Sequence, residues 1–219
     1  MSWTYDSNDP GLALFTAALK AGAQMPVKAG DRLLDVGCNE ADWVKHAHEA
    51  WPEAIVGGLD WRATEWNSPD GNAWKMKGNG LDPDLFVPAS FDGIVSLSAV
   101  EHFGLGHYKQ DPKDPDGDSH VIANCWRWLK PGGFLYFDVP YNPAGYQVRG
   151  TEYRTYDDDA LWERLWQAPL CETKSRAQWQ WTGYCHSNHT TELIEKPSYQ
   201  PDDRLRYYVA MCWQKVTSA

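Results

Sequence analysis

The chain has 219 residues, of which 42% are hydrophobic and 23% charged, a length and composition that suit one globular domain with a sizeable core. No apolar run of about 20 residues occurs, so we expect no membrane-spanning helix, and the polar N-terminus has neither the basic start nor the apolar stretch of a secretory signal. The net charge of −10 disfavours non-specific binding to nucleic acid, because such binding depends on Lys and Arg that neutralise phosphates.

The cysteines point to a reducing compartment. There are five of them, an odd number, and they are widely spaced. They form no CxxC pair, and no cluster of Cys and His has the spacing of zinc ligands. We therefore expect a cytoplasmic protein without a structural metal site.

Stretches of helical periodicity alternate with short apolar stretches along the chain. Apolar residues that recur on one face predict helices over residues 9–22, 40–51, 118–129 and 157–167. Short apolar runs predict seven strands, over residues 32–36, 54–59, 74–77, 92–98, 134–139, 171–181 and 204–216.

This alternation predicts an α/β fold with a mostly parallel sheet and helices on both faces. Between the last two strands no helical pattern occurs, so we expect those strands to pair antiparallel. Residues 182–203, which include His186, Asn188 and His189, are predicted to form the long connection between them. A connection of that length in a compact domain is usually functional or mobile.

The segment RLLDVGCNEADW, residues 32–43, reads as a strand, a glycine turn and the start of a helix. In a parallel sheet such a turn lies at the carboxyl end of the strand, where ligands bind. Gly37 allows the backbone to approach a ligand closely, and Asn39 is among the few non-glycine residues that tolerate positive φ. A nicotinamide enzyme would carry GxGxxG here, and Asn39 with Glu40 does not supply it. Taken alone, the turn could also be an ordinary connection.

Asp60 ends the second predicted strand, 25 residues after Asp35. A carboxylate at that place can accept hydrogen bonds from both hydroxyls of a ribose. The alternative is an exposed acid in a turn, and the spacing from the first turn favours the ribose interpretation.

Four motifs then follow in a fixed order: LLDVGCN, IVGGLDW, SFDGIVSLSAVEHF and LKPGGFLYFDVP. Together they resemble the class I S-adenosylmethionine-dependent methyltransferases over residues 32–140, about half the chain. The resemblance implies a Rossmann-like fold, S-adenosyl-L-methionine as cofactor, and one methyltransferase domain over residues 1–219.

The same resemblance implies which residues surround the cofactor. Asp60 would hold the ribose, Trp61 would flank the adenine, and Ser96 with Ser98 would line the floor below the sulfonium. The remaining positions would follow the methionine part and the adenine edge: Asp35, Gly37, Cys38 and Asn39 for the first, and Asn79, Gly80 and Leu81 for the second. The family often has an acid near the adenine edge, which leaves Asn79 and Asp82 as alternatives.

EHFGLGHY, followed by DPDGD, is similar to a less characterised branch of these methyltransferases that is often associated with sugar or glycan modification. Glu101 and His102 follow the fourth predicted strand, beside the expected place of methyl transfer, and His107 and Tyr108 follow a glycine-rich turn. Transfer to a hydroxyl also needs a base, and histidine suits that role near neutral pH. His102 is our first candidate and His107 the second; Glu101 and His102 could instead anchor the loop.

The DPDGD segment allows more than one interpretation. It can be a turn followed by a helix cap at Asp118. A metal site built from Asp111, Asp114, Asp116 and Asp118 is the less favoured alternative, since the spacing matches no calcium loop.

The acceptor pocket should be built by the segments outside the shared core, residues 1–24, 103–118, 141–156 and 182–203. Their Tyr, His and Asn residues, with Arg149 and Arg154, fit a polar, ring-bearing acceptor. We expect methylation on oxygen or nitrogen of a small polar molecule, such as a sugar or nucleotide-sugar. The alternatives are a nucleic acid or modified base, bound through the less acidic C-terminal part, and an inactive cofactor-binding partner subunit. The oligomeric state stays open.

Overall fold

The computed structural model describes residues 15–19, 23, 25–38, 43–107, 113–173, 176–186, 193–198 and 207–216. Within this part, residues 15–19 are helical, which agrees with the predicted first helix. The other residues of the predicted range 9–22 lie outside the described part. Asn39, Tyr108, Asn188 and His189 also lie outside the described residues.

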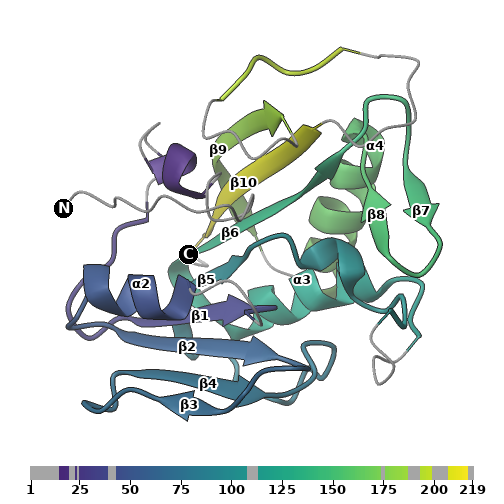
Figure 1. Ribbon diagram of the computed structural model, residues 1–219. Coiled ribbons are helices and arrows are strands. Elements are labelled where there is room, and N and C mark those ends of the chain that lie inside the picture. The colour runs from purple at the N-terminus through teal and green to yellow at the C-terminus, as the bar shows by residue number, and fades with distance from the viewer. Residues whose placement is uncertain are drawn as a thin grey trace.

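One twisted sheet organises the domain (Figure 1), with strand order β3-β4-β2-β1-β5-β6-β10-β9. Its parallel part confirms the predicted α/β architecture, because β1 pairs parallel with β2 and β5, β2 with β4, and β5 with β6. The prediction of seven strands misses β3, a two-residue strand antiparallel to β4. The strands are β1 (Arg32–Val36), β2 (Ile55–Asp60), β3 (Trp66–Asn67), β4 (Ala73–Lys77), β5 (Phe91–Ser96), β6 (Leu129–Tyr141), β9 (Ala177–His186) and β10 (Tyr207–Lys215).

The C-terminal strands pair antiparallel, as expected, and β10 inserts between β6 and β9. Two boundaries differ from the prediction. Residues 171–173 end the helix α5 (Ala168–Thr173) instead of starting a strand, and β9 continues to His186 instead of ending at Trp181. The predicted connection over residues 182–203 is therefore shorter, and Ile194 within it bridges back to Tyr184.

Buried side chains cover both faces of the sheet. Leu33 belongs to one core cluster, which contains Phe15 and the helix α2 (Trp43–Ala50). Leu34, the next residue along β1, belongs to the other, which contains the helix α3 (Gly117–Trp128). Neighbouring residues of a strand point to opposite faces, so these clusters place helices on both sides of the sheet, as predicted.

The predicted helix over residues 157–167 is longer and less regular than expected. It comprises α4 (Asp158–Ala160), the π-helix η2 (Leu161–Gln167) and α5. Asp157 caps its start, since its Oδ1 accepts the backbone N–H of Ala160 at 2.9 Å. Leu161 and Leu165 of this helix are buried, and α3 packs against α5.

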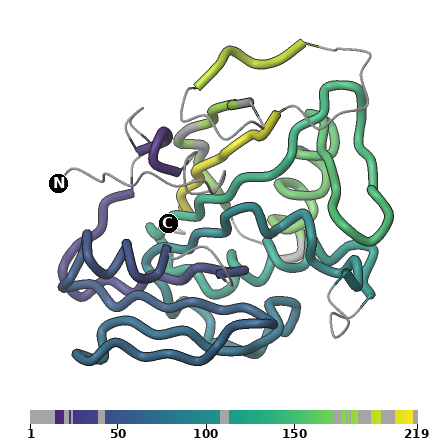
Figure 2. Tube along the Cα trace, in the orientation of Figure 1, coloured from purple at the N-terminus to yellow at the C-terminus, as the bar shows by residue number. Residues whose placement is uncertain are grey.

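Residues 141–156, predicted as a loop, contain a hairpin of β7 (Gln147–Arg149) and β8 (Tyr153–Thr155). The hairpin extends from the carboxyl end of β6 (Figure 2), and β8 packs against both β6 and the 3-10 helix η1 (Val100–His102). It therefore stands beside the turn that follows β5.

The carboxyl ends of β1, β2, β4, β5 and β6 meet at one edge of the sheet, and the candidate residues that the structure describes lie at or near it. Among the helices that the structure describes, none has the length and apolar character needed to cross a bilayer.

Candidate active site

The first turn is bonded to the end of the neighbouring strand. The backbone N–H groups of Gly37 and Cys38 both donate to the Leu59 carbonyl, at 2.8 and 3.2 Å. Gly37 has φ of 93°, and a Cβ there would lie 2.3 Å from the Cβ of Ala99. Glycine is therefore needed for two reasons, the positive φ and the close approach of the turn that follows β5.

The Cys38 side chain points away from this edge and into the core. A Cβ on Gly58 would lie 2.7 Å from the Cys38 sulfur, and the thiol is fully buried. Burial, together with the charges of Asp35 and Asp60, raises the pKa of this thiol far above its ordinary value. Cys38 therefore carries a neutral thiol, and it can face a ligand only with its backbone. Asp35 is also buried, in the middle of the sheet.

Asp60 ends β2 at the same edge and is 9% exposed. Its Oδ1 accepts the backbone N–H of Arg62 at 2.6 Å, and its backbone carbonyl accepts the N–H of Gly78 at 3.1 Å. The carboxylate is thus oriented by its own turn and tied to the end of β4. Trp61 is half-buried beside it, and no described residue accepts a hydrogen bond from its buried indole N–H.

In the turn after β4, the Asn79 side chain bonds to the backbone of the same turn. Asn79 Oδ1 accepts the backbone N–H of Leu81 at 3.0 Å, which closes an Asx turn. Gly80 is buried: its carbonyl accepts Asn124 Nδ2 of α3 at 2.9 Å, and a Cβ there would lie 2.7 Å from the Phe103 ring. This turn therefore adjoins the segment that follows η1.

The two serines after β5 differ in their surroundings. Ser96 is fully buried and its Oγ donates to the Val36 carbonyl at 2.7 Å, so it joins β5 to β1. Ser98 has φ of 45°, unusual for a residue other than glycine. Its backbone N–H and Oγ both donate to Asp138 Oδ1, at 3.0 and 3.2 Å, and this pair of bonds holds the strained backbone.

Asp138 and Tyr208 join this edge although the sequence analysis did not select them. Asp138 is fully buried on β6, within the otherwise apolar run at residues 134–139. Burial and the nearby charges of Glu101 and Asp138 raise the pKa of the Tyr208 hydroxyl, against a hydrogen bond with Ser98. The sequence did offer a signal for this site, because a carboxylate inside an apolar run must find polar partners when it is buried.

Glu101, His102 and His107, the described candidates for the acceptor side, lie close together. Glu101 Oε1 lies 3.8 Å from His102 Nε2, and the rings of His102 and His107 stack with centroids 6.2 Å apart. Glu101 is 1% exposed, and burial raises the pKa of its carboxyl from 4.5 to about 8, against the lowering effects of a backbone hydrogen bond and of Arg154. His102 Nδ1 contacts the Glu152 carbonyl. The site thus joins an imidazole to a carboxyl that is protonated at neutral pH.

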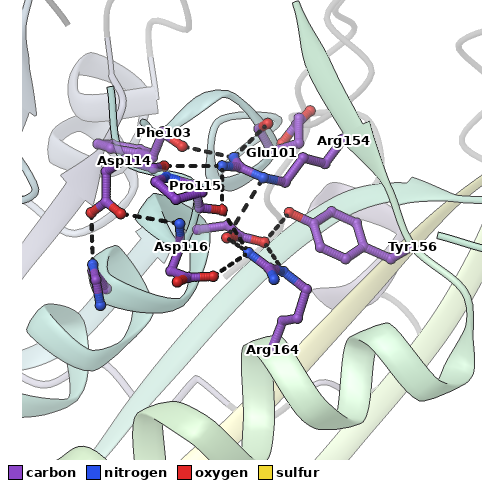
Figure 3. Close-up of polar contacts among 10 residues, drawn as sticks. Glu101, Phe103, Asp114, Pro115, Asp116, Arg154, Tyr156 and Arg164 are labelled. Carbon is purple, nitrogen blue, oxygen red and sulfur yellow. Dashed lines mark hydrogen bonds and ion pairs between the residues drawn. The ribbon is translucent and has the colours of Figure 1, made fainter. Parts of the chain in front are cut away.

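Asp118 is the centre of a buried ion-pair network, and Figure 3 labels its partners Arg154, Tyr156 and Arg164. Arg164 donates to both of its oxygens, at 2.7 and 2.9 Å, and the Tyr156 hydroxyl donates at 2.9 Å. Arg154 Nε lies 3.6 Å away, and both Asp118 and Arg154 are fully buried.

Two predictions are wrong at this network. Asp118 does not cap its helix: the cap residue is Asp116, which makes no side-chain cap bond, and Asp118 is already inside α3. Arg154 does not line an open pocket, since it is fully buried. The residues described also include no group of three or more His, Cys, Asp or Glu that could hold a metal ion, and Asp111 lies outside them. The partners of Asp118 are distant in sequence, so the local DPDGD segment could not reveal them.

Comparison with known proteins begins with a family model that matches residues 86–156, less than half of the chain. The family is described as a Caenorhabditis protein of unknown function, DUF268. The match includes the EHFGLGHY segment, α3 and the β7–β8 hairpin, and so the candidate base and the network residues Asp118, Arg154 and Tyr156, but not Arg164.

A curated relative matches a longer part of the chain. It is trans-aconitate 2-methyltransferase from Streptomyces avermitilis, 26% identical over 117 residues, which are 51% of this chain. The chain covers 39% of the length of that relative.

Solved structures of methyltransferases share the fold. Geranyl diphosphate C-methyltransferase from Streptomyces coelicolor A3(2), solved with geranyl diphosphate, Mg²⁺ and S-adenosylhomocysteine, has a TM-score of 0.57 at 14% identity, over 92% of this chain and 77% of its own. The 1,6-didemethyltoxoflavin-N1-methyltransferase from Burkholderia thailandensis, solved with its substrate and S-adenosylhomocysteine, has a TM-score of 0.54 at 15% identity, over 94% and 77%. The chain therefore has the class I methyltransferase fold, as its motifs predict.

Proposed function

We propose that this protein is an S-adenosylmethionine-dependent methyltransferase whose acceptor is a small polar molecule. The observation that carries the proposal is the joining of three strand ends at one edge. Gly37 and Cys38 bond to the end of β2, and Gly78 bonds to Asp60. This edge is where nucleotide ligands bind in open α/β sheets, and the resemblance of the motifs assigns the same turns to the cofactor.

The residues at this edge fit such a cofactor. Gly37 keeps the first turn free of a side chain, Asp60 supplies a carboxylate for ribose hydroxyls, and Trp61 supplies an aromatic face for adenine. S-adenosylmethionine would supply a methyl group activated on a sulfonium. The chain's own task is then to bind, align the acceptor and exclude water, because an in-line displacement depends mainly on positioning.

The acceptor side supports transfer to oxygen or nitrogen. When Nδ1 of His102 donates to the Glu152 carbonyl, the neutral ring leaves Nε2 able to accept a proton from the acceptor. Glu101 beside it is protonated at neutral pH, because burial raises its pKa to about 8, so it places no negative charge next to the ring. We therefore retain His102 as the first candidate base and His107 as the second.

The similar proteins support a small molecule as the acceptor. Their names give trans-aconitate, geranyl diphosphate and 1,6-didemethyltoxoflavin, all small molecules. For this chain a sugar or nucleotide-sugar is the first class to test, because the acceptor-side segments are polar and aromatic. We also propose that residues 1–219 act as one methyltransferase domain.

The test uses S-adenosylmethionine with a tritiated methyl group and parallel panels of sugars, nucleotide-sugars, small carboxylates and transfer RNA. Transfer to a small polar acceptor, lost in His102→Gln and retained in the exposed-site control Glu163→Gln, is the expected result. Transfer to RNA alone would contradict a small polar acceptor and would identify nucleic acid as the acceptor class. Cofactor binding without transfer to any panel would favour the inactive partner subunit.

A further inference from the structure

The β7–β8 hairpin contacts the candidate base from outside the shared sheet. Arg154, on β8, is fully buried, and its Nη1 donates to the carbonyls of Glu101 and Phe103, at 3.3 and 2.7 Å. These two carbonyls lie on either side of His102 in the chain (Figure 3 shows the carbonyl contacts). One guanidinium nitrogen therefore fixes the turn on both sides of the histidine.

The same guanidinium also reaches the start of α3. Its Nη2 donates to the carbonyls of Asp114 and Pro115, at 3.4 and 3.2 Å, while Nε faces Asp118. Arginine is suited to this because its planar fork presents several donors in fixed directions, whereas lysine offers a single ammonium on a flexible stem. Arg154 thus joins the turn around His102 and the residues that precede α3 to the hairpin.

A second contact from the hairpin acts on the histidine ring itself. The Glu152 backbone carbonyl contacts His102 Nδ1. Because a carbonyl only accepts hydrogen bonds, Nδ1 must carry the hydrogen, and a neutral ring then has its lone pair on Nε2. That is the nitrogen facing Glu101, 3.8 Å from Oε1.

We propose that residues 147–155 form a positioning element for the candidate base, in which the Glu152 carbonyl selects the Nδ1–H form of His102 and Arg154 holds the surrounding turn. This inference rests on the proposed function, because the selected lone pair matters only for a base. It assigns a role to a hairpin outside the shared cofactor-binding core.

The inference can be tested without knowing the acceptor, because histidine tautomers are visible in long-range ¹H–¹⁵N spectra. The ¹⁵N-labelled full chain is measured at a pH where the ring is neutral, and His102→Asn identifies the signals of His102. We expect the Nδ1–H form to dominate. In Arg154→Lys the ratio of the two forms should change on the order of tenfold toward Nε2–H, the effect of losing about one hydrogen bond.

Arg164→Lys is the matched control. Arg164 also bonds to Asp118 and to the Pro115 carbonyl, but none of its contacts reaches residues 100–103. Its variant should leave the tautomer ratio unchanged, and so should Glu152→Ala, because Glu152 acts through its backbone. Equal changes in Arg154→Lys and Arg164→Lys would overturn the positioning role.

The wild-type spectrum alone decides the tautomer, even if Arg154→Lys does not fold. A dominant Nε2–H form in the wild type would overturn the proposal. Failure of the wild type to bind S-adenosylhomocysteine would instead overturn the proposed function, while leaving the tautomer result unaffected.

Discussion

Replacing Glu101 by glutamine tests whether this buried carboxyl makes stability depend on pH. Burial raises its pKa from 4.5 to about 8 in the folded chain. Because the folded chain then holds a proton that the unfolded chain has released, stability falls as the pH rises through this window. The loss is absent below 4.5, grows up to about 8 and stays constant above that value. Glutamine keeps the shape of the neutral carboxyl and does not titrate.

The size of the effect follows from the two pKa values. At about 1.4 kcal/mol for each pH unit, the wild type should lose about 4 kcal/mol of unfolding free energy relative to Glu101→Gln between about pH 5 and about pH 9. Urea unfolding of both proteins at the two pH values measures it. Glu163→Gln, at an exposed position, should follow the wild type. A Glu101→Gln variant with the same pH dependence as the wild type would refute the reasoning.

Two further substitutions test the packing of the site. Asp118→Asn weakens a buried network that holds two arginines, and urea unfolding should show a loss of roughly 3–5 kcal/mol, since it leaves buried charge uncompensated; a loss below about 1 kcal/mol would argue against a buried network. Gly37→Ala forces a Cβ onto Ala99 in addition to the positive φ, whereas Gly132→Ala, with φ of 84° and open space, carries the φ cost alone. Gly37→Ala should therefore lower the free energy of unfolding by more than the roughly 1–2 kcal/mol expected for Gly132→Ala. Equal losses of stability in thermal unfolding would contradict the close contact.

The strand ends and turns that the resemblance assigns to the cofactor could be placed from the sequence, because their signals are local. A short apolar strand, a glycine turn and an acid at the end of the next strand are each readable within a few residues, and the parallel pairing then brings them together. Glu101 and His102 follow the same rule, since they come directly after β5. Glycine at 37 is required by Ala99 as well as by φ, which no local pattern could show.

The acceptor side could not be predicted in the same way, because long-range contacts build it. Asp118 meets Arg154 and Arg164, 36 and 46 residues further along the chain, so its neighbours in sequence could not indicate the ion-pair network. The β7–β8 hairpin has three residues in each strand, too few for a periodic pattern. Only the last three residues of α5, at 171–173, were predicted as the start of a strand, because so few residues carry no periodic signal.

Calorimetric titration of the full chain with S-adenosylhomocysteine tests the central claim most directly. We expect the full chain to bind S-adenosylhomocysteine, and Asp60→Asn to weaken this binding by about 1–3 kcal/mol through loss of a ribose contact. Asp31→Asn is the matched control: Asp31 also accepts a local backbone N–H, from Lys28 at 2.7 Å, but it precedes β1 at the opposite end of the strand. Its variant should bind as the wild type does. No binding at millimolar ligand, or equal affinity in the wild type and Asp60→Asn, would contradict the assignment.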